Sequence, residues 1–222
     1  KGWVLRSQKR VFRDSYANHI ENKENLILTS EQTEALVQIK DTIEAQKHST
    51  FLLQGVTGSG KTEIYLRTAA EALLHEKQVM VLVPEIALTG QIVERFKAWF
   101  GKRVAVVHSK LSQSERADVW YKMRTGYADI LIGVRSAVFA PFLDLGLIIM
   151  DEEQEYSYKQ EERPSYNART ISLKRAQMAS IPLLLGSATP DICTYFHALK
   201  GRYQHLHLTK RANESDMPDV TI

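Results

Sequence analysis

The stretch 55–62 has the residue types and the spacing of a phosphate-binding loop. It reads Gly-Val-Thr-Gly-Ser-Gly-Lys-Thr and satisfies the pattern G-x-x-x-x-G-K-[ST]. Glycines let backbone N–H groups converge on phosphate oxygens, and the N-terminus of a following helix adds partial positive charge. We expect Lys61 to reach the β- and γ-phosphates of ATP and the Thr62 hydroxyl to bind Mg²⁺. The predicted nucleotide contacts of the loop are Gly55, Thr57, Gly58, Ser59, Gly60, Lys61 and Thr62.

An acidic stretch that follows an apolar run is the expected partner of this loop. Residues 147–154 read Leu-Ile-Ile-Met-Asp-Glu-Glu-Gln, so Asp151 and Glu152 stand at the end of a buried strand. Asp151 is suited to hold Mg²⁺, and Glu152 to orient and deprotonate an attacking water. Glu152, Asp151 and Lys61 are therefore the predicted catalytic residues. For Glu153 and the later glutamates, an ordinary solvated acidic loop is at least as good an explanation as a role in catalysis.

Apolar runs alternate with stretches of helical spacing along the rest of the chain. The runs predicted as strands are 51–54, 79–83, 104–107, 130–134, 147–150 and 183–185. The stretches predicted as helices are 31–46, 62–74, 91–100, 113–124 and 168–179. The runs are continuously apolar, which is typical of strands buried on both faces of a parallel sheet. The pattern predicts a doubly wound α/β domain that binds its ligands at the carboxyl ends of the strands.

The composition limits the classes of protein that remain. The 222 residues are 44% hydrophobic and carry a net charge of +3, which permits an anionic partner without requiring one. The single cysteine, Cys193, excludes a disulfide framework and a cysteine zinc site within this sequence. No apolar run approaches the roughly 20 residues that cross a bilayer, so we expect no membrane partner. A first residue of Lys1 instead of Met indicates a fragment of a longer chain.

Taken together, the motifs resemble those of superfamily 2 helicases. The phosphate loop and residues 151–154 are similar to motifs I and II of that superfamily. The stretch 186–190, Gly-Ser-Ala-Thr-Pro, is similar to motif III, and 84–89 is similar to motif Ia.

A narrower resemblance is carried by four stretches jointly: 55–63, 83–89, 133–137 and 158–160. They resemble the primosomal protein N′ (PriA) family of bacterial replication restart helicases. This resemblance implies a RecA-like P-loop domain over residues 29–222, a mostly parallel sheet with helices on both faces, forming the ATP-binding lobe 1. It implies that residues 1–28 are a linker or the tail of a preceding DNA-binding region.

The family resemblance also implies an activity and its partners. Members are ATP- and Mg²⁺-dependent 3′-to-5′ DNA helicases that act on single-stranded or forked DNA and assemble with primosome and replication restart proteins. The expected location is the bacterial cytoplasm, in association with the nucleoid. A zinc module and a second motor lobe with an arginine finger belong to the full-length family and are not contained in this sequence. We therefore expect the chain alone to bind nucleotide weakly and to hydrolyse it inefficiently.

Two glutamines have roles that depend on this resemblance. Gln154 stands where the family usually has histidine, and it is expected to couple motif II to Ser187 and Thr189 of motif III. Gln32 matches the glutamine that reads the adenine edge in the family. The spacing Thr29-x-x-Gln32 is equally that of a helix capping box, so both roles stay open for Gln32.

Several segments that follow strands resemble lobe 1 elements that track a DNA backbone. Arg135 and Ser136 suit contacts to phosphates, as do the segments 85–89 and 108–109, although ordinary loop chemistry explains these as well. The segment 156–166 contains three tyrosines and is similar to a loop that couples DNA binding to hydrolysis. Its tyrosines, Tyr158 among them, offer stacking surfaces for unpaired bases, and Lys159 or Arg163 can meet phosphates. Because the acids of the segment would repel DNA, a mobile coupling element is favoured over a static binding platform.

Two other functions are compatible with the same residues. The chain could belong to another superfamily 2 DNA translocase, such as a RecG-like branch-migration motor. It could also be a non-catalytic module that docks DNA or a protein partner. Sensitivity of ATP affinity to Lys61→Ala favours a motor, whereas DNA binding without nucleotide favours a docking module.

Overall fold

The computed structural model describes residues 27–85, 87 and 90–210. Most of the predicted N-terminal linker, 1–28, therefore lies outside the described residues, as does Thr89 at the end of the motif Ia segment. The described part of the chain has no helix long and apolar enough to span a membrane.

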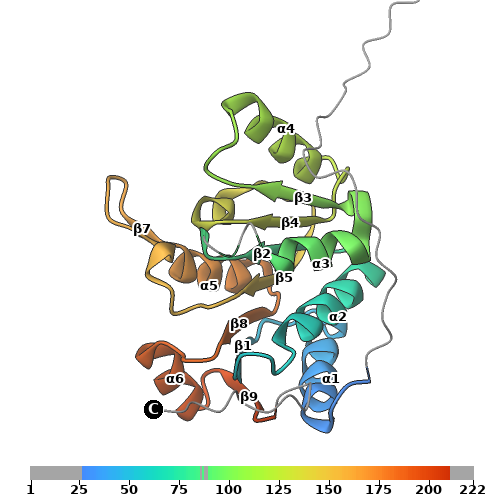
Figure 1. The fold of residues 1–222 in the computed structure, drawn as a ribbon, viewed down its shortest axis with the longest axis vertical. Helices are drawn as coiled ribbons and strands as arrows, with labels where there is room; N and C mark the ends of the chain where they lie inside the picture. Colours follow the sequence, from blue (N-terminus) through green and yellow to red (C-terminus); the bar gives the residue numbers. More distant parts are fainter. Residues whose placement is uncertain (1–26, 86, 88–89, 211–222) are drawn as a thin grey trace, which may run out of the picture.

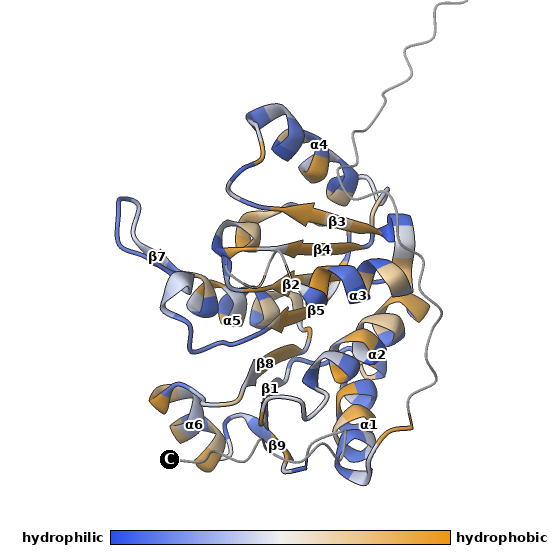
Figure 2. Cartoon of the chain, in the orientation of Figure 1, coloured by the Kyte–Doolittle hydropathy of each residue, from blue (hydrophilic) through white to orange (hydrophobic). Residues whose placement is uncertain are grey.

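The centre of the fold is a seven-stranded sheet in which all neighbouring strands are parallel. The strand order is β3-β4-β2-β5-β8-β1-β9. The strands are β1 (Thr50–Gly55), β2 (Gln78–Leu82), β3 (Val104–Val107), β4 (Ile130–Gly133), β5 (Leu145–Met150), β8 (Leu183–Ser187) and β9 (Gln204–Leu208). The six that were predicted are almost wholly buried, because helices cover both faces and apolar side chains are needed on both. Figure 2 shows them as continuous hydrophobic bands.

Helices form a layer on each face of the sheet (Figure 1). On one face lie α1 (Ser30–Glu44), α2 (Lys61–Leu74) and α3 (Gln91–Phe100), whose buried side chains share one hydrophobic cluster with the strands. On the other face, α4 (Gln113–Arg124) and α5 (Ala168–Ala179) share a second cluster. Burying each large aliphatic side chain in these clusters contributes about 1.5–3 kcal/mol. The predicted doubly wound α/β architecture, a parallel sheet with helices on both faces, is confirmed.

The last part of the described chain was not predicted. Helix α6 (Ile192–Leu199) follows β8 and contacts β1 and β9. Strand β9 then pairs with β1 as an edge strand. Its sequence, Gln-His-Leu-His-Leu, has only two apolar residues, Leu206 and Leu208, and only these are buried. Because only one face of this strand is buried, its two leucines do not form a continuous apolar run, and the strand could not be recognised in the sequence.

The order of the strands determines which loops meet. Strands β5, β8 and β1 are direct neighbours, so the segments that follow their carboxyl ends share one edge of the sheet. On the same edge, β2 and β4 are followed by other loops and by the short 3-10 helix η3 (Arg135–Phe139). Beyond β5 the chain forms η4 (Tyr156–Tyr158) and an antiparallel pair of two-residue strands, β6 (Lys159–Gln160) and β7 (Tyr166–Asn167).

Candidate nucleotide and nucleic-acid sites

The phosphate loop connects the end of β1 to the start of α2, as the sequence predicts. Gly60 is the N-cap of α2 and has a φ of 85°, a left-handed conformation that favours glycine. The first N–H groups of α2 have no acceptor within the helix, so an anion bound at the loop can accept from them. The Ser59 hydroxyl in the loop is buried and has no hydrogen-bond partner among the described residues. The loop therefore has unused donors of the kind that phosphate oxygens satisfy.

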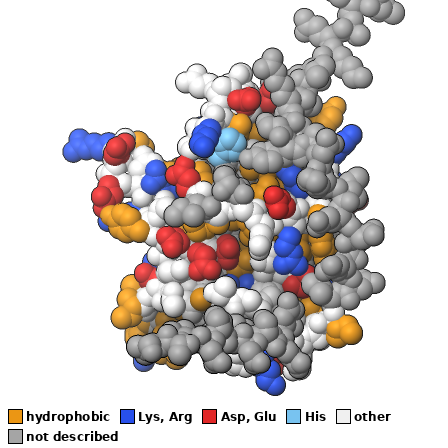
Figure 3. All heavy atoms as spheres, in the orientation of Figure 1, with side chains coloured by type: hydrophobic (Ala, Val, Ile, Leu, Met, Phe, Trp, Pro, Cys, Tyr) orange, Lys and Arg blue, Asp and Glu red, His pale blue; other side chains and the backbone are white. Residues whose placement is uncertain are grey.

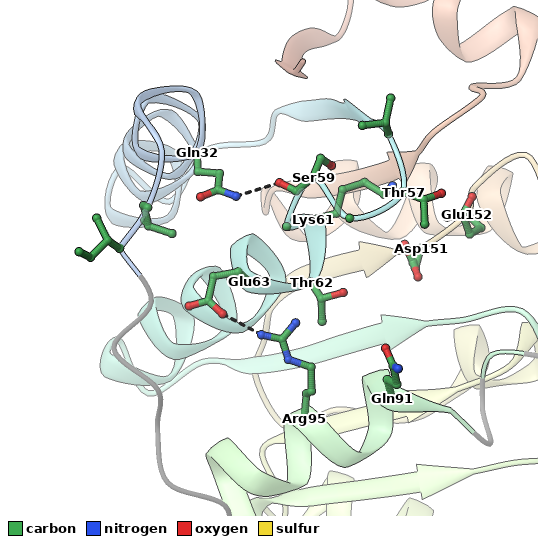
Figure 4. A pocket seen from close by; sticks show the side chains of 15 residues that line it. Gln32, Thr57, Ser59, Lys61, Thr62, Glu63, Gln91, Arg95, Asp151 and Glu152 are labelled. Carbon is green, nitrogen blue, oxygen red and sulfur yellow. Dashed lines mark hydrogen bonds and ion pairs between the residues drawn. The ribbon is translucent and has the colours of Figure 1, made fainter. Parts of the chain in front are cut away.

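A cavity of about 490 Å³ brings the two predicted halves of the site together. Residues of the loop from Val56 to Thr62 line one side of it, and Asp151 and Glu152 line the other (Figure 4). Lys61 donates from Nζ to the Gly55 carbonyl at 2.7 Å, so its side chain lies over the loop. The oxygen atoms of Thr62 and Asp151 are ligands that Mg²⁺ prefers, so the side chains present fit this metal.

Asp151 is held by two tyrosines that approach it from different elements. The Tyr65 hydroxyl, on α2, donates to Asp151 Oδ1 at 2.8 Å. The Tyr158 hydroxyl, on η4, donates to the Asp151 carbonyl oxygen at 2.7 Å. Burial raises the pKa of the Asp151 carboxyl, and the hydrogen bond from Tyr65 opposes that rise. Burial and the nearby Asp151 carboxylate raise the pKa of Tyr65 well above its usual value, so this phenol stays a donor.

Glu152 begins a chain of hydrogen bonds that leads to motif III. Its backbone has a φ of 45°, an uncommon conformation for a residue with a side chain and one that occurs at functional sites. Gln154 donates from Nε2 to Glu152 Oε2 at 2.8 Å and accepts from the Ser187 hydroxyl at 2.6 Å. Ser187 in turn accepts from the Thr189 backbone N–H at 2.9 Å. The predicted hydrogen bond from Gln154 toward motif III is confirmed.

Glu153 does not behave as part of a solvated acidic loop, so that interpretation is wrong for this residue. Its side chain is fully buried and accepts from Arg169 at 2.6 Å and from the Thr194 hydroxyl at 2.9 Å. It also accepts from the Asp191 backbone N–H at 2.8 Å. The carboxylate thus ties the acidic stretch to α5 and α6. Sequence spacing could not show this, because the three donors are 16 to 41 positions away.

Both ends of the Gln32 side-chain amide hydrogen-bond to protein groups. Its Oε1 accepts from the Thr29 backbone N–H at 2.9 Å, and the Thr29 hydroxyl accepts from the Gln32 N–H, so the capping box is present. Its Nε2 donates to the Ser59 carbonyl at 2.8 Å, a contact drawn in Figure 4. Gln32 therefore caps α1 and braces the phosphate loop. It also lines the nucleotide cavity, and its contact with adenine stays a prediction.

A second cavity, of about 260 Å³, lies at the part of the same edge that follows β2 and β4. Arg135 and Ser136 line it, as predicted, together with Glu85 and Ser109, whose side chains hydrogen-bond at 2.5 Å. Arg116 also lines it from α4 and was missed by sequence analysis. Its Nε atom is buried and has no partner among the described residues. His108 does not line this cavity.

The segment 156–166, called the aromatic segment below, is attached to this cavity by Arg135. The Arg135 guanidinium donates to the Lys159 carbonyl at 2.7 Å and lies 5.9 Å from the centre of the Tyr166 ring. Tyr158 is only 2% exposed, so the prediction that its ring stacks on an unpaired base is wrong for this arrangement. The ring packs in the core because its hydroxyl reaches the Asp151 carbonyl. Tyr156, in contrast, is 65% exposed.

The charges of the aromatic segment are mixed and pair with one another. Lys159 forms an ion pair with Glu161 at 3.0 Å, and the Tyr156 hydroxyl donates to the same carboxylate. In the space-filling view, the protruding segment at the left carries basic and acidic side chains side by side (Figure 3). Lys159 is thus compensated by a local acid, and its contact with a phosphate stays a prediction.

Comparison with known proteins relates this chain to helicases. The model of the family described as DEAD/DEAH box helicase matches residues 29–195. Replication restart protein PriA of Bacillus subtilis (strain 168) is 49% identical over 223 residues, which cover 100% of this chain. PriA of Haemophilus influenzae (strain Rd) is 47% identical over 199 residues and 89% of this chain. The chain spans only 28% and 27% of the length of these two relatives.

Solved structures share the fold at lower sequence identity. RecG bound to a three-way DNA junction matches with a TM-score of 0.63 and 23% identity, over 86% of this chain and 25% of that one. The Pyrococcus furiosus Hef helicase domain matches with a TM-score of 0.55 and 20% identity, over 80% of this chain and 37% of that one. These matches support the RecA-like arrangement of the sheet and its helices.

Proposed function

The chain belongs to the DEAD/DEAH box helicase family, and from this premise we propose that it is the ATP-binding lobe of a DNA-dependent motor. The observation that supports this most strongly is the single cavity shared by the phosphate loop and the Asp151–Glu152 pair. Its volume, about 490 Å³, lies within the range of small-molecule sites.

Each residue of the cavity has a distinct role in this proposal. The N–H groups of the loop and the Lys61 ammonium bind the β- and γ-phosphates, and Lys61 leaves the Gly55 carbonyl to do so. Thr62 and Asp151 would hold Mg²⁺, which when bound neutralises charge on the phosphates. Glu152 orients a water and accepts its proton. The hydrogen bond from Gln154 fixes the Glu152 carboxylate for this task.

The motor also needs a route from nucleotide to DNA. We infer two such routes, each starting at the acidic stretch. One runs from Glu152 through Gln154 to Ser187 and Thr189. The other runs from the Asp151 carbonyl through Tyr158 to the aromatic segment, which Arg135 ties to the second cavity. Single-stranded DNA is proposed to follow that cavity, with phosphates near Arg116, Arg135 and Ser136.

Similarity to PriA supports a more specific assignment for the full-length protein. We propose a 3′-to-5′ DNA helicase that acts at forked DNA during replication restart and works with primosome proteins in the bacterial cytoplasm, near the nucleoid. Zinc is proposed for the full-length protein and not for this chain, which has one cysteine. A RecG-like motor is less well supported, because the similarity to RecG is 23% identity against 49% for PriA.

Hydrolysis by the full-length protein, with and without forked DNA, tests the proposal. Glu152→Gln removes the base but keeps the size of the side chain, so turnover is expected to fall by about 10²- to 10⁴-fold. Glu34→Gln is the matched control, since this glutamate is exposed on α1 and lines neither cavity. The control is expected to keep normal turnover.

The chain on its own is expected to turn over ATP slowly, because no second lobe completes its site. Rapid turnover by the chain alone, abolished by Glu152→Gln, would refute the need for a second lobe. A docking module would instead bind DNA equally well with and without nucleotide and would not respond to Lys61→Ala.

A further inference from the structure

Tyr65 lies one helical turn after Lys61 on α2, on the same side of the helix. Lys61 lines the nucleotide cavity, whereas Tyr65 points into the protein interior below the phosphate loop. The Tyr65 side chain is completely buried. A buried phenol hydroxyl needs a hydrogen-bond partner, and at this position it has one that takes part in the proposed chemistry.

The partner is the carboxylate of Asp151. The Tyr65 hydroxyl donates to Asp151 Oδ1 at 2.8 Å, across 86 positions of sequence. Tyr65 does not line the nucleotide cavity, whereas Asp151 does. The tyrosine therefore reaches the carboxylate from outside the cavity, where it can fix the orientation of that group without touching a ligand in the cavity.

Motif III is shaped around the same hydroxyl. Gly186, on β8, has no side chain, and a Cβ atom added there would lie 1.7 Å from the Tyr65 hydroxyl oxygen and 2.8 Å from the adjacent ring carbon Cζ. No residue other than glycine fits at position 186 while Tyr65 keeps its place. The Tyr65 hydroxyl, which comes from α2, is thus enclosed by Asp151 at the end of β5 and Gly186 on β8. The helix that follows motif I therefore meets motifs II and III at this hydroxyl.

We propose that Tyr65 is the positioning residue for the metal-binding carboxylate of Asp151. Its hydroxyl orients the carboxylate for Mg²⁺, and Gly186 preserves the space that this hydrogen bond requires. The inference rests on the proposed function, because it assumes that Asp151 holds Mg²⁺ next to ATP. Groups that orient a metal ligand from behind typically contribute 10- to 100-fold in metal affinity.

The test compares nucleotide binding with and without metal in Tyr65→Phe, which removes only the hydroxyl. A fluorescent ATP analogue is titrated with the chain in EDTA and then at increasing Mg²⁺ concentrations. Affinity in EDTA should stay within about 2-fold of wild type, since the loop and Lys61 are unchanged. The Mg²⁺ concentration that gives half of the metal-dependent gain should rise by about 10-fold or more. Tyr203→Phe, a half-buried tyrosine outside the cavity, is the matched control and should leave both values unchanged.

Gly186→Ala provides a second, independent variant. In the wild-type background its Cβ must displace the Tyr65 hydroxyl, so it should weaken Mg²⁺ dependence as Tyr65→Phe does. In the Tyr65→Phe background the closest obstacle is gone, so adding Gly186→Ala should cost clearly less than it does alone. This non-additivity is a signature that general destabilisation at two separate sites would not give.

Two results would overturn the inference. One is an unchanged Mg²⁺ dependence in folded Tyr65→Phe, and the other is an equal loss of affinity with and without Mg²⁺. If wild type itself shows no Mg²⁺-dependent gain and no effect of Lys61→Ala, the proposed function fails and takes this inference with it. Failure of Tyr65→Phe alone leaves the proposed function intact.

Discussion

The surroundings of the nucleotide cavity, called the nucleotide edge below, and the aromatic segment lie at the same edge of the sheet but are built differently. At the nucleotide edge, acidic side chains are buried and have partners on other elements: Asp151 with Tyr65, and Glu153 with Arg169. In the aromatic segment, Lys159 and Glu161 are exposed and pair with each other. Interactions within one exposed segment contribute little to stability, whereas buried ones across elements fix geometry. The first region is suited to hold reacting groups in place, and the second to move when DNA binds.

One residue belongs to both regions. Tyr158 is part of the aromatic segment by sequence, yet its ring is buried and its hydroxyl bonds to the backbone of Asp151. Arg135 anchors the backbone on either side of it, at Ser157 and Lys159. A displacement of the segment by DNA would therefore be transmitted through Tyr158 to Asp151, the proposed metal ligand.

Removal of the Glu153 carboxylate should give the largest loss of stability. Glu153→Ala leaves Arg169 and Thr194 without their buried acceptor, and breaking a buried ion pair typically costs 3–5 kcal/mol. Arg169 keeps a contact with Asp191 at 3.2 Å, so we expect about 3 kcal/mol. Chemical denaturation measures this. Glu153→Gln, which retains the hydrogen bond from the Asp191 N–H, should lose less. Equal stability of Glu153→Ala and wild type would remove the contrast between the two regions.

A smaller effect is expected at the residue that joins the regions. Tyr158→Phe loses one hydrogen bond to a carbonyl, which corresponds to about 0.5–1.5 kcal/mol. The effect of this substitution on function should be larger than its effect on stability. DNA should stimulate hydrolysis by the full-length variant less than it stimulates the wild type, while turnover without DNA stays close to the wild-type value. Tyr156→Phe, in the exposed part of the segment, should change stability by less than about 0.5 kcal/mol. If Tyr158→Phe responds to DNA as wild type does, coupling does not pass through Tyr158.

The smallest effect is expected at the second cavity, where each residue is one of several proposed DNA contacts. Arg116→Ala should weaken binding of single-stranded DNA similarly for all sequences, because a phosphate contact reads no bases. Neutralising one fewer phosphate should reduce the slope of log affinity against log salt by about 1. Lys174→Ala, an exposed lysine on α5, removes the same charge outside the cavity. A salt slope for Arg116→Ala equal to that of Lys174→Ala would place Arg116 outside the DNA path.

Local patterns were sufficient to predict the parts of the fold and site that depend on neighbouring residues. The phosphate loop, the helices at 91–100, 113–124 and 168–179 and most strands were placed correctly, because continuous apolar runs and helical spacing are short-range signals. That the phosphate loop and Asp151 line one cavity also followed, since parallel strands bring their carboxyl ends to one edge.

Features that depend on contacts between distant residues were missed. Tyr65 and Asp151 are 86 positions apart, and nothing in either local sequence indicates their hydrogen bond. The spacing of Tyr65 from Lys61 could have shown that its side chain lies beneath the loop, but not what it meets there. Tyr158 was grouped with the tyrosines that offer stacking surfaces, because three tyrosines near charged residues look alike in sequence. Only the packing distinguishes Tyr158 from Tyr156.

The central claim is that the loop at 55–62 binds the phosphates of ATP within a cavity that Asp151 also lines. Calorimetric titration of Mg²⁺-ATP into this chain tests it most directly, with Lys61→Ala as the variant and Lys174→Ala as the control. We expect saturable binding at one site, unchanged in the control and weakened about 10- to 100-fold in Lys61→Ala, which loses a hydrogen bond to a charged group. Absence of binding to wild type, or equal affinity in Lys61→Ala, would contradict the claim.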